Sequence, residues 1–168
     1  VLDPDDGLAE LASEPDLVLE PWLADELVVF CAPQHPLAAS GSASSEQLAA
    51  QPWILRETGS GTRALFDRAI APRLATLQVR LQLEHTEAIK RAVEAGLGLA
   101  CLSRMALREA FRRGSLVELR TPQFDLQRNF YFVRHRQRHV SPASRAFIAL
   151  CRSFGDAAAE AAYLAIQQ

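Results

Sequence analysis

The feature that most constrains the fold is a regular alternation of short apolar runs with longer segments of helical pattern. Apolar runs bounded by proline, glycine or charge are typical of β-strands. They occupy residues 17–19, 27–31, 53–55, 77–83, 97–102, 116–119 and 130–133. The pattern predicts helices at 45–50, 62–70, 86–95, 104–112 and from Ser141 onward. Strands alternating with such helices favour an α/β fold with largely parallel pairing.

Several predicted helix ends carry their own local signals. Ser141 offers an N-cap hydroxyl directly before Pro142, which suits the first helical turn. Gly96 and Gly114 follow predicted helices, where a left-handed residue is often required. These signals support the helix boundaries independently of the apolar pattern.

Composition limits the class of protein. Of the 168 residues, 49% are hydrophobic and 23% are charged, which is typical of a folded domain rather than of disorder. No apolar run reaches the length of a membrane span, and the N-terminal residues do not resemble a signal peptide. We therefore expect a cytoplasmic protein without a membrane partner. The basic and aromatic residues of the Arg-rich stretch 99–140 do not follow an interleaved pattern, which favours solvated faces over a DNA-binding surface.

Residue types that could support catalysis or bind a metal are not grouped in a productive pattern. Cys31, Cys101 and Cys151 lie in apolar surroundings at spacings that no zinc site uses, so buried neutral thiols are expected. His135 and His139 follow a predicted strand, where a spacing of four has no helical meaning. No serine lies in a nucleophile-elbow sequence. The sequence predicts neither an enzyme nor a cofactor or metal site.

The segment PWILRETGSGTR, residues 52–63, predicts a strand, a polar loop with two glycines, and a helix start. Glycines allow close backbone approach, hydroxyls donate hydrogen bonds, and a helix start offers unpaired N–H groups, so the loop suits an anion. The candidate residues are Thr58, Gly59, Ser60, Gly61 and Thr62. The spacing fits equally well a simple N-cap at Ser60 or Thr62. A P-loop and a Rossmann fingerprint are excluded by the glycine spacing and the missing lysine.

A second candidate helix start follows the predicted strand 77–83. His85 and Thr86 would present polar groups at the carboxyl end of that strand, where α/β folds bind ligands. Taken alone, His85 is more readily explained as a cap or a surface residue. Its assignment to a site depends on its position beside the glycine-containing loop.

Three sequence runs together resemble one known family. They are DLVLEPWLADELVVFCAPQHPLA (16–38), ILRETGSGTRALFD (54–67) and HTEAIKRAVEAGLGLACLSRMAL (85–107). In this order and spacing they are similar to the effector-binding, or substrate-binding, domain of LysR-type transcriptional regulators. The resemblance implies a two-lobed α/β fold like that of type 2 periplasmic binding proteins. It also implies an effector cleft lined by residues 58–62 and by His85 and Thr86.

The resemblance also implies a division of the chain into lobes. We expect residues 53–118 to form the second lobe and residues 1–52 with 119–168 to form the first. The sequence itself places the crossovers near 51–53 and 118–124, because a Ser-, Ala- and Gly-rich segment precedes the first and the sequence changes character at Thr121-Pro122. Family members carry further strands and helices, and a winged helix-turn-helix, before the point that matches Val1. The first lobe is therefore expected to be incomplete at its N-terminus.

Three functions remain open from the sequence. The resemblance favours the sensor of a bacterial regulator that binds a small anionic metabolite, forms a dimer or tetramer, and contacts DNA only through a winged helix-turn-helix absent from this sequence. A free periplasmic-type solute-binding protein is the alternative, because a shared fold does not determine function. Residues upstream of Val1 would separate these two. An enzyme on the same fold is the third possibility, and it lacks a recognisable catalytic residue.

Overall fold

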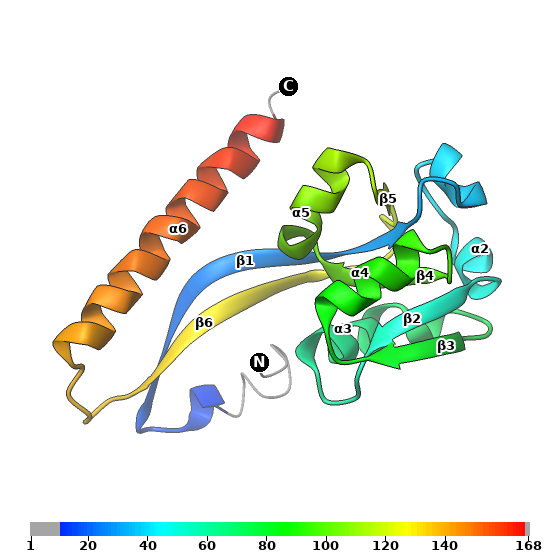
Figure 1. Cartoon of the computed structure of the whole chain (residues 1–168). Coiled ribbons are helices and arrows are strands. Elements are labelled where there is room, and N and C mark those ends of the chain that lie inside the picture. Colours follow the sequence, from blue (N-terminus) through cyan, green and yellow to red (C-terminus); the bar gives the residue numbers. More distant parts are fainter. Residues whose placement is uncertain (1–10, 167–168) are drawn as a thin grey trace. The chain divides into compact units, whose positions relative to one another are not determined.

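The computed structural model describes residues 11–166, so the predicted opening of the first lobe, residues 1–10, lies outside the described residues. The strands are β1 (Leu17–Cys31), β2 (Pro52–Arg56), β3 (Gln78–Leu83), β4 (Leu99–Ser103), β5 (Val117–Leu119) and β6 (Gln127–His135) (Figure 1). The α-helices are α2 (Ser45–Ala49), α3 (Gly61–Ala69), α4 (Thr86–Glu94), α5 (Arg104–Arg113) and α6 (Pro142–Ile166). Two short 3-10 helices, η1 (Pro36–Ala39) and η2 (Ala71–Arg73), complete the order.

The predicted helices are confirmed to within a residue or two at their ends, whereas one strand prediction is wrong. The runs 17–19 and 27–31 are parts of a single strand, β1. Residues 20–26 between them include three carboxylates and a proline, so they do not form an apolar run. Pairing with β6 keeps this stretch extended, and the sequence pattern cannot show that pairing.

The described residues divide into two compact units. One comprises Asp25–Arg128, and the other comprises residues 11–24 and 129–166. Residues 25–52 and 119–128 therefore pack with 53–118, although the sequence pattern placed the crossovers near 51–53 and 118–124.

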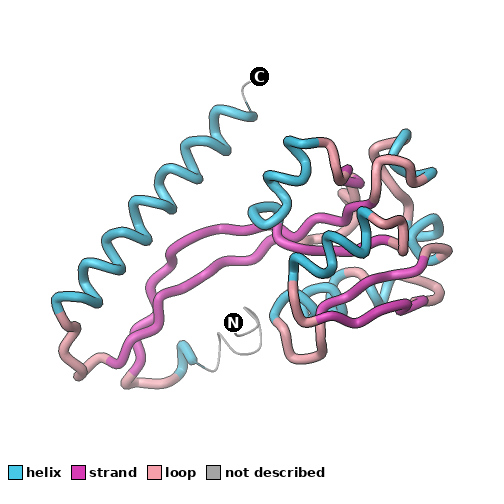
Figure 2. The backbone as a smooth tube through the Cα atoms, in the orientation of Figure 1, coloured by secondary structure: helices cyan, strands magenta, loops and turns pink. Residues whose placement is uncertain are grey.

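The sheet is mixed, which corrects the expectation of largely parallel pairing. Its strand order is β3-β2-β4-β1-β5, and β6 also pairs with β1 (Figure 2). Strand β2 lies parallel to both β3 and β4, whereas β1 lies antiparallel to β4 and β5. Parallel pairing thus holds for the three strands that alternate with α3 and α4.

Both faces of the sheet in the unit Asp25–Arg128 are covered by helices. Alternate residues of β1 enter two different cores: Leu27, Val29 and Cys31 pack with residues of α2 and α3, whereas Val28 and Phe30 pack with residues of α4 and α5. Successive side chains of a strand point to opposite faces, so a strand buried on both faces has a continuous apolar sequence. This explains the run LVVFC.

The helix ends follow the local signals. Ser44, Ser60 and Ser103 each accept a hydrogen bond from a backbone N–H in the first turn of the following helix. Gly114 ends α5 with φ +70°, and Gly96 follows α4 with φ +76°, as predicted for left-handed residues.

The unit of residues 11–24 and 129–166 is built around Trp22. Its ring centroid lies 5.2 Å from that of Phe132 and 6.3 Å from that of Phe130. Its indole N–H donates to the Cys151 carbonyl oxygen at 2.8 Å, which fixes α6 on the strands of this unit. Among the described residues no helix is both long and apolar enough to cross a membrane.

Candidate functional site

The two predicted site segments lie at the same edge of the sheet. Strands β2 and β3 run parallel, and Arg56 at the end of β2 is paired with Leu83 at the end of β3. The loop 57–60 and the turn before α4 therefore both leave the carboxyl ends of neighbouring strands. Strand β4 is also parallel to β2, so Ser103 and the start of α5 belong to this edge as well. Ligands of α/β proteins bind at such edges.

The start of α3 combines a turn with a side-chain cap. Gly59 has φ +94°, a conformation that residues with a Cβ rarely adopt. The hydroxyl of Ser60 accepts a hydrogen bond from the Arg63 N–H at 3.1 Å, so the capping role that the sequence left open belongs to Ser60. Thr58 and Gly59 are exposed, whereas Thr62 in the first turn is buried.

The start of α4 has no side-chain cap. His85 occupies the N-cap position, but its side chain makes no capping hydrogen bond, and Thr86 begins the helix. The positive ends of two nine-residue helices, α3 and α4, therefore follow adjacent strands.

Glu57 shows that the loop and His85 are electrostatically connected. Hydrogen bonds from Arg56, at 2.7 and 2.8 Å, are the main reason that the pKa of Glu57 lies below its usual value, and the charge of His85 lowers this pKa further. The Arg56 guanidinium offsets the charge of the single carboxylate in this loop.

Arg63 holds the loop against both strands. Its guanidinium donates to the Arg56 carbonyl oxygen and to the Gln82 side chain, each at 3.2 Å. It also pairs with Asp67 one turn further along α3, at 2.8 Å. The start of α3 is thereby held to β2 and β3 by one side chain.

Sequence reasoning missed a buried polar cluster at the same edge. Asp25 and Arg128 form an ion pair at 2.7 Å, and their side chains are 0% and 9% exposed. Arg128 also donates to the Thr62 hydroxyl at 3.3 Å, and the Ser103 hydroxyl donates to Asp25 at 2.8 Å. In each case the available signal was a charged residue two positions before an apolar run, at 27–31 and at 130–133. No sequence rule pairs two such residues over 103 positions.

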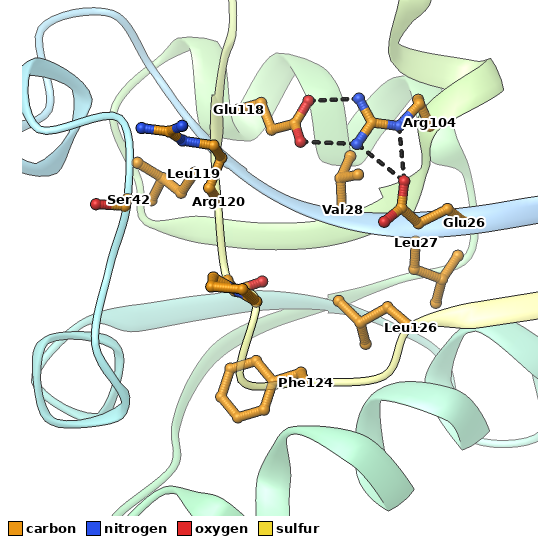
Figure 3. A pocket seen from close by; sticks show the side chains of 12 residues that line it. Glu26, Leu27, Val28, Ser42, Arg104, Glu118, Leu119, Arg120, Phe124 and Leu126 are labelled. Carbon is orange, nitrogen blue, oxygen red and sulfur yellow. Dashed lines mark hydrogen bonds and ion pairs between the residues drawn. The ribbon is translucent and has the colours of Figure 1, made fainter. Parts of the chain in front are cut away.

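A separate pocket of about 610 Å³ lies between β1 and the segment 118–126, and none of the predicted site residues line it (Figure 3). Leu27, Phe124 and Leu126 are among its apolar lining residues. The Arg104 guanidinium at one end is paired with both Glu118 and Glu26, at 2.6 and 2.9 Å. Arg120 also lines the pocket, so its two arginines balance its two carboxylates in formal charge. The edge of β2 and β3, where the starts of α3 and α4 lie together, is the better match to an anion.

The described side chains at this edge are suited to hydrogen bonding. Burial raises the pKa of Cys101 on the adjacent β4 to about 12, so its thiol is neutral at physiological pH. Within the described residues no group of three or more His, Cys, Asp or Glu side chains could hold a metal ion. Hydroxyls, backbone N–H groups and helix ends suit recognition of a small anion.

Comparison with known proteins identifies the family. The family model of the LysR substrate binding domain matches residues 7–156. The chain belongs to this family. The resemblance based on the sequence runs is confirmed, and so is the two-lobed α/β fold class like that of periplasmic binding proteins, since the similar structures are LysR-type regulatory domains.

Two curated relatives of this LysR-family chain are regulators. YeiE of Escherichia coli K12, named an uncharacterized HTH-type transcriptional regulator, is 46% identical over 136 residues, which are 81% of this chain and 46% of that protein. The HTH-type transcriptional activator CmpR of Synechocystis is 32% identical over 141 residues, which are 84% of this chain and 46% of that protein. The chain thus spans less than half the length of these relatives. Transcriptional regulators are not enzymes, in agreement with the sequence-based prediction.

Two solved structures of similar fold contain small molecules. The regulatory domain of Synechocystis CcmR in complex with 2-PG has a TM-score of 0.71 and 31% identity, covering 85% of this chain and 69% of that one. The effector-binding domain of QuiR in complex with shikimate has a TM-score of 0.70 and 25% identity, covering 86% of this chain and 68% of that one.

Proposed function

We propose that this chain is the ligand-sensing part of a bacterial LysR-type regulator and that it binds a small anionic metabolite. The proposed binding residues are Thr58, Gly59, Ser60, Gly61, Thr62, His85 and Thr86. The observation that carries the proposal is the register Arg56 to Leu83, which brings the starts of α3 and α4 to one edge. Helix starts favour negative charge, and the hydroxyls supply further donors. The small molecules bound to the CcmR and QuiR domains support a small-molecule effector.

The lobe boundaries are revised within this proposal. We assign Asp25–Arg128 to the second lobe instead of 53–118, because β1 contributes residues 27–31 to the same sheet as β4 and β5. The crossovers are then the points where β1 and β6 pass residues 24–25 and 128–129. The first lobe then comprises the described residues 11–24 and 129–166. It is still split between an N-terminal and a C-terminal segment, as the family resemblance implies.

The proposed mechanism is a shift of a pre-existing equilibrium. The effector stabilises the lobe arrangement for which it has the higher affinity, and it can shift the equilibrium only by that difference in affinity. The response is passed, within a dimer or tetramer in the cytoplasm, to a winged helix-turn-helix outside this sequence. That domain makes the contacts with DNA.

A thermal-shift screen of the full-length protein tests the binding residues. The probes are small carboxylates, phosphorylated acids, sulfate, sulfite and aromatic acids. A probe at a hundred times its Kd stabilises the folded protein by about 2.7 kcal/mol, which raises Tm by a few degrees. The shift should disappear in a Thr58→Ala/Ser60→Ala variant.

Ser44→Ala is the matched control, because Ser44 caps α2 as Ser60 caps α3. Each substitution removes an N-cap hydroxyl and costs about 1 kcal/mol. Ser44→Ala should lower Tm and keep the probe-induced shift. A probe-induced Tm shift of equal size in wild type, the Thr58→Ala/Ser60→Ala variant and Ser44→Ala would show that the effector binds outside this loop.

A further inference from the structure

Arg128 occupies the centre of the buried polar cluster. Its Nε donates to one oxygen of Asp25 at 2.8 Å, and a terminal nitrogen lies 2.7 Å from the same oxygen. The other Asp25 oxygen accepts from Ser103, whose hydroxyl also caps α5 by accepting from the Met105 N–H at 3.2 Å. A second terminal nitrogen of Arg128 reaches Thr62 at 3.3 Å. One guanidinium thereby links the first turn of α3, directly through Thr62, to the N-cap of α5, through Asp25 and Ser103.

Thr62 uses its hydroxyl only as an acceptor within the described residues, since its one hydrogen bond comes from Arg128. A hydroxyl that accepts from a cation keeps its own proton for another acceptor, and the charge strengthens it as a donor. Thr62 lies two residues after the cap Ser60, at the start of α3. Its proton is therefore available where the proposed anion binds.

The positions of the ion pair add a second consequence. Among the described residues, Asp25 and Arg128 are the first and last of their unit, and they lie on the two strands, β1 and β6, that continue into the other unit. The hydrogen bond from Arg128 to Thr62 connects the start of α3 to these two points. Through this hydrogen bond, a structural change at the anion site is transmitted to the points where both strands leave the unit.

Stability alone is a weak explanation for this arrangement. Replacement of a buried ion pair by well-packed apolar side chains is often neutral or stabilising, because the desolvation of two charges offsets their attraction. Leu27 and Cys101, each two residues along its strand from a member of the cluster, belong to one buried apolar core, so apolar residues are compatible with this region.

We propose that Arg128 is a positioning residue of the effector site. Its hydrogen bond to Thr62 orients the Thr62 hydroxyl proton toward the bound anion. Its ion pair with Asp25 connects that hydroxyl to the points where β1 and β6 leave the unit. This inference rests on the proposed function of the loop 58–62. Arg128 does not touch the anion, and its effect on affinity passes through the Thr62 hydroxyl.

The test uses the full-length protein and the probes sulfate, phosphate, 2-PG and shikimate, with affinity measured by calorimetry. Thr62→Val removes the hydroxyl at nearly constant volume, and Thr62→Ser restores it. Hydrogen bonds to charged groups contribute about 1.5–3 kcal/mol, so Thr62→Val should weaken binding by about 10- to 100-fold. Thr62→Ser should restore most of the affinity. Thr76→Val is the matched control, because its hydroxyl donates to the Ala49 carbonyl oxygen at 3.3 Å and lies outside the proposed site.

A second variant, Asp25→Leu/Arg128→Met, removes both charges of the ion pair together. It should weaken the same probe as Thr62→Val does, and adding Thr62→Val to it should cause little further loss, because both changes interrupt one connection. Backbone amides at the start of α3 should exchange hydrogen faster in the double variant, with no probe present.

The outcomes separate the two proposals. If Ser60→Ala abolishes binding of a probe while Thr62→Val and the double variant bind it like wild type, the positioning role is overturned and the binding loop stands. If wild type binds none of the probes, or Ser60→Ala binds as tightly as wild type, the binding loop is overturned and the positioning role with it. Additive losses from Thr62→Val and the double variant would also overturn the positioning role.

Discussion

Asp25 and Arg128 lie 103 residues apart in the sequence and form an ion pair whose carboxylate is fully buried. Both carboxylate oxygens of Asp25 accept a hydrogen bond, one from Arg128 and the other from the Ser103 hydroxyl. Such a cluster is costly to leave half complete, because a buried charge without its partner keeps the desolvation penalty and loses the compensating attraction.

Removal of one partner should therefore destabilise the protein more than removal of both. Asp25→Ala or Arg128→Ala should lower the free energy of unfolding by about 3–5 kcal/mol. Asp25→Leu/Arg128→Met should lower it by clearly less than either single change. Urea denaturation of the full-length protein measures the three values. A double variant as unstable as the sum of the two singles would show that the residues act independently.

Gly98 should tolerate alanine worse than Gly59 does. A Cβ at Gly98 would lie 2.3 Å from the Pro52 carbonyl oxygen, and φ there is +154°. Gly59 has φ +94° with open space around the added atom. Gly59→Ala should cost about 1–2 kcal/mol from backbone strain alone, whereas Gly98→Ala adds a clash with backbone that cannot move cheaply. Thermal denaturation of both variants checks the order, and equal losses of Tm would contradict it.

Phe66 should be a major contributor to the core beside α3. It is 1% exposed and its ring meets Trp53 edge-on at a centroid distance of 4.9 Å. Phe66→Ala should cost about 3–5 kcal/mol through lost burial and the cavity that remains. Phe66→Leu fills much of that space and should cost less than half as much. Chemical denaturation compares the two, and similar losses would mean that the ring contact with Trp53 matters more than volume.

The buried thiols should make stability fall at alkaline pH. Burial raises the pKa of Cys31 to about 11 and that of Cys101 to about 12, from 9.0. Above pH 9 the thiols of the unfolded chain ionise while those of the folded chain stay neutral. The stabilisation from neutral burial is therefore complete below pH 9 and is lost as pH rises toward 11 and 12.

Each thiol that ionises only in the unfolded chain steepens this decline by up to about 1.4 kcal/mol per pH unit. A Cys31→Ala/Cys101→Ala variant should lose less stability than wild type between pH 8.5 and 10.5, in denaturation curves recorded under reducing conditions. Identical slopes for the two proteins would show that other groups control the alkaline loss.

The site could be predicted in part because its pieces are local. The helix start at residues 60–62 follows from a serine and two glycines after a short apolar strand, and the signal lies within a few residues. That Ser60 and not Thr62 is the cap depends on where the backbone changes from extended to helical, which is at Ser60 and which the spacing does not specify.

The pairing of β1 could not be predicted from the local sequence, and the reason is different. The apolar run at 27–31 has no preference for one neighbour, because both of its faces are buried and its sequence does not alternate. Its antiparallel pairing with β4 and β5, and its continuation into one strand with residues 17–26, come from contacts with segments 70 or more residues away. The lobe boundaries placed near 51–53 and 118–124 depended on that missing information.

The sequence by itself determined the α/β class, most of the order of the elements, several helix ends and the family, because each depends on periodicity or on short motifs within a few residues. Tertiary structure alone decided that the starts of α3, α4 and α5 share one edge and that Asp25 meets Arg128 beside Thr62. Burial makes that difference: an ion pair inside the protein requires both charges to be desolvated together, and only the folded chain places residues 25, 62, 103 and 128 close enough to do so.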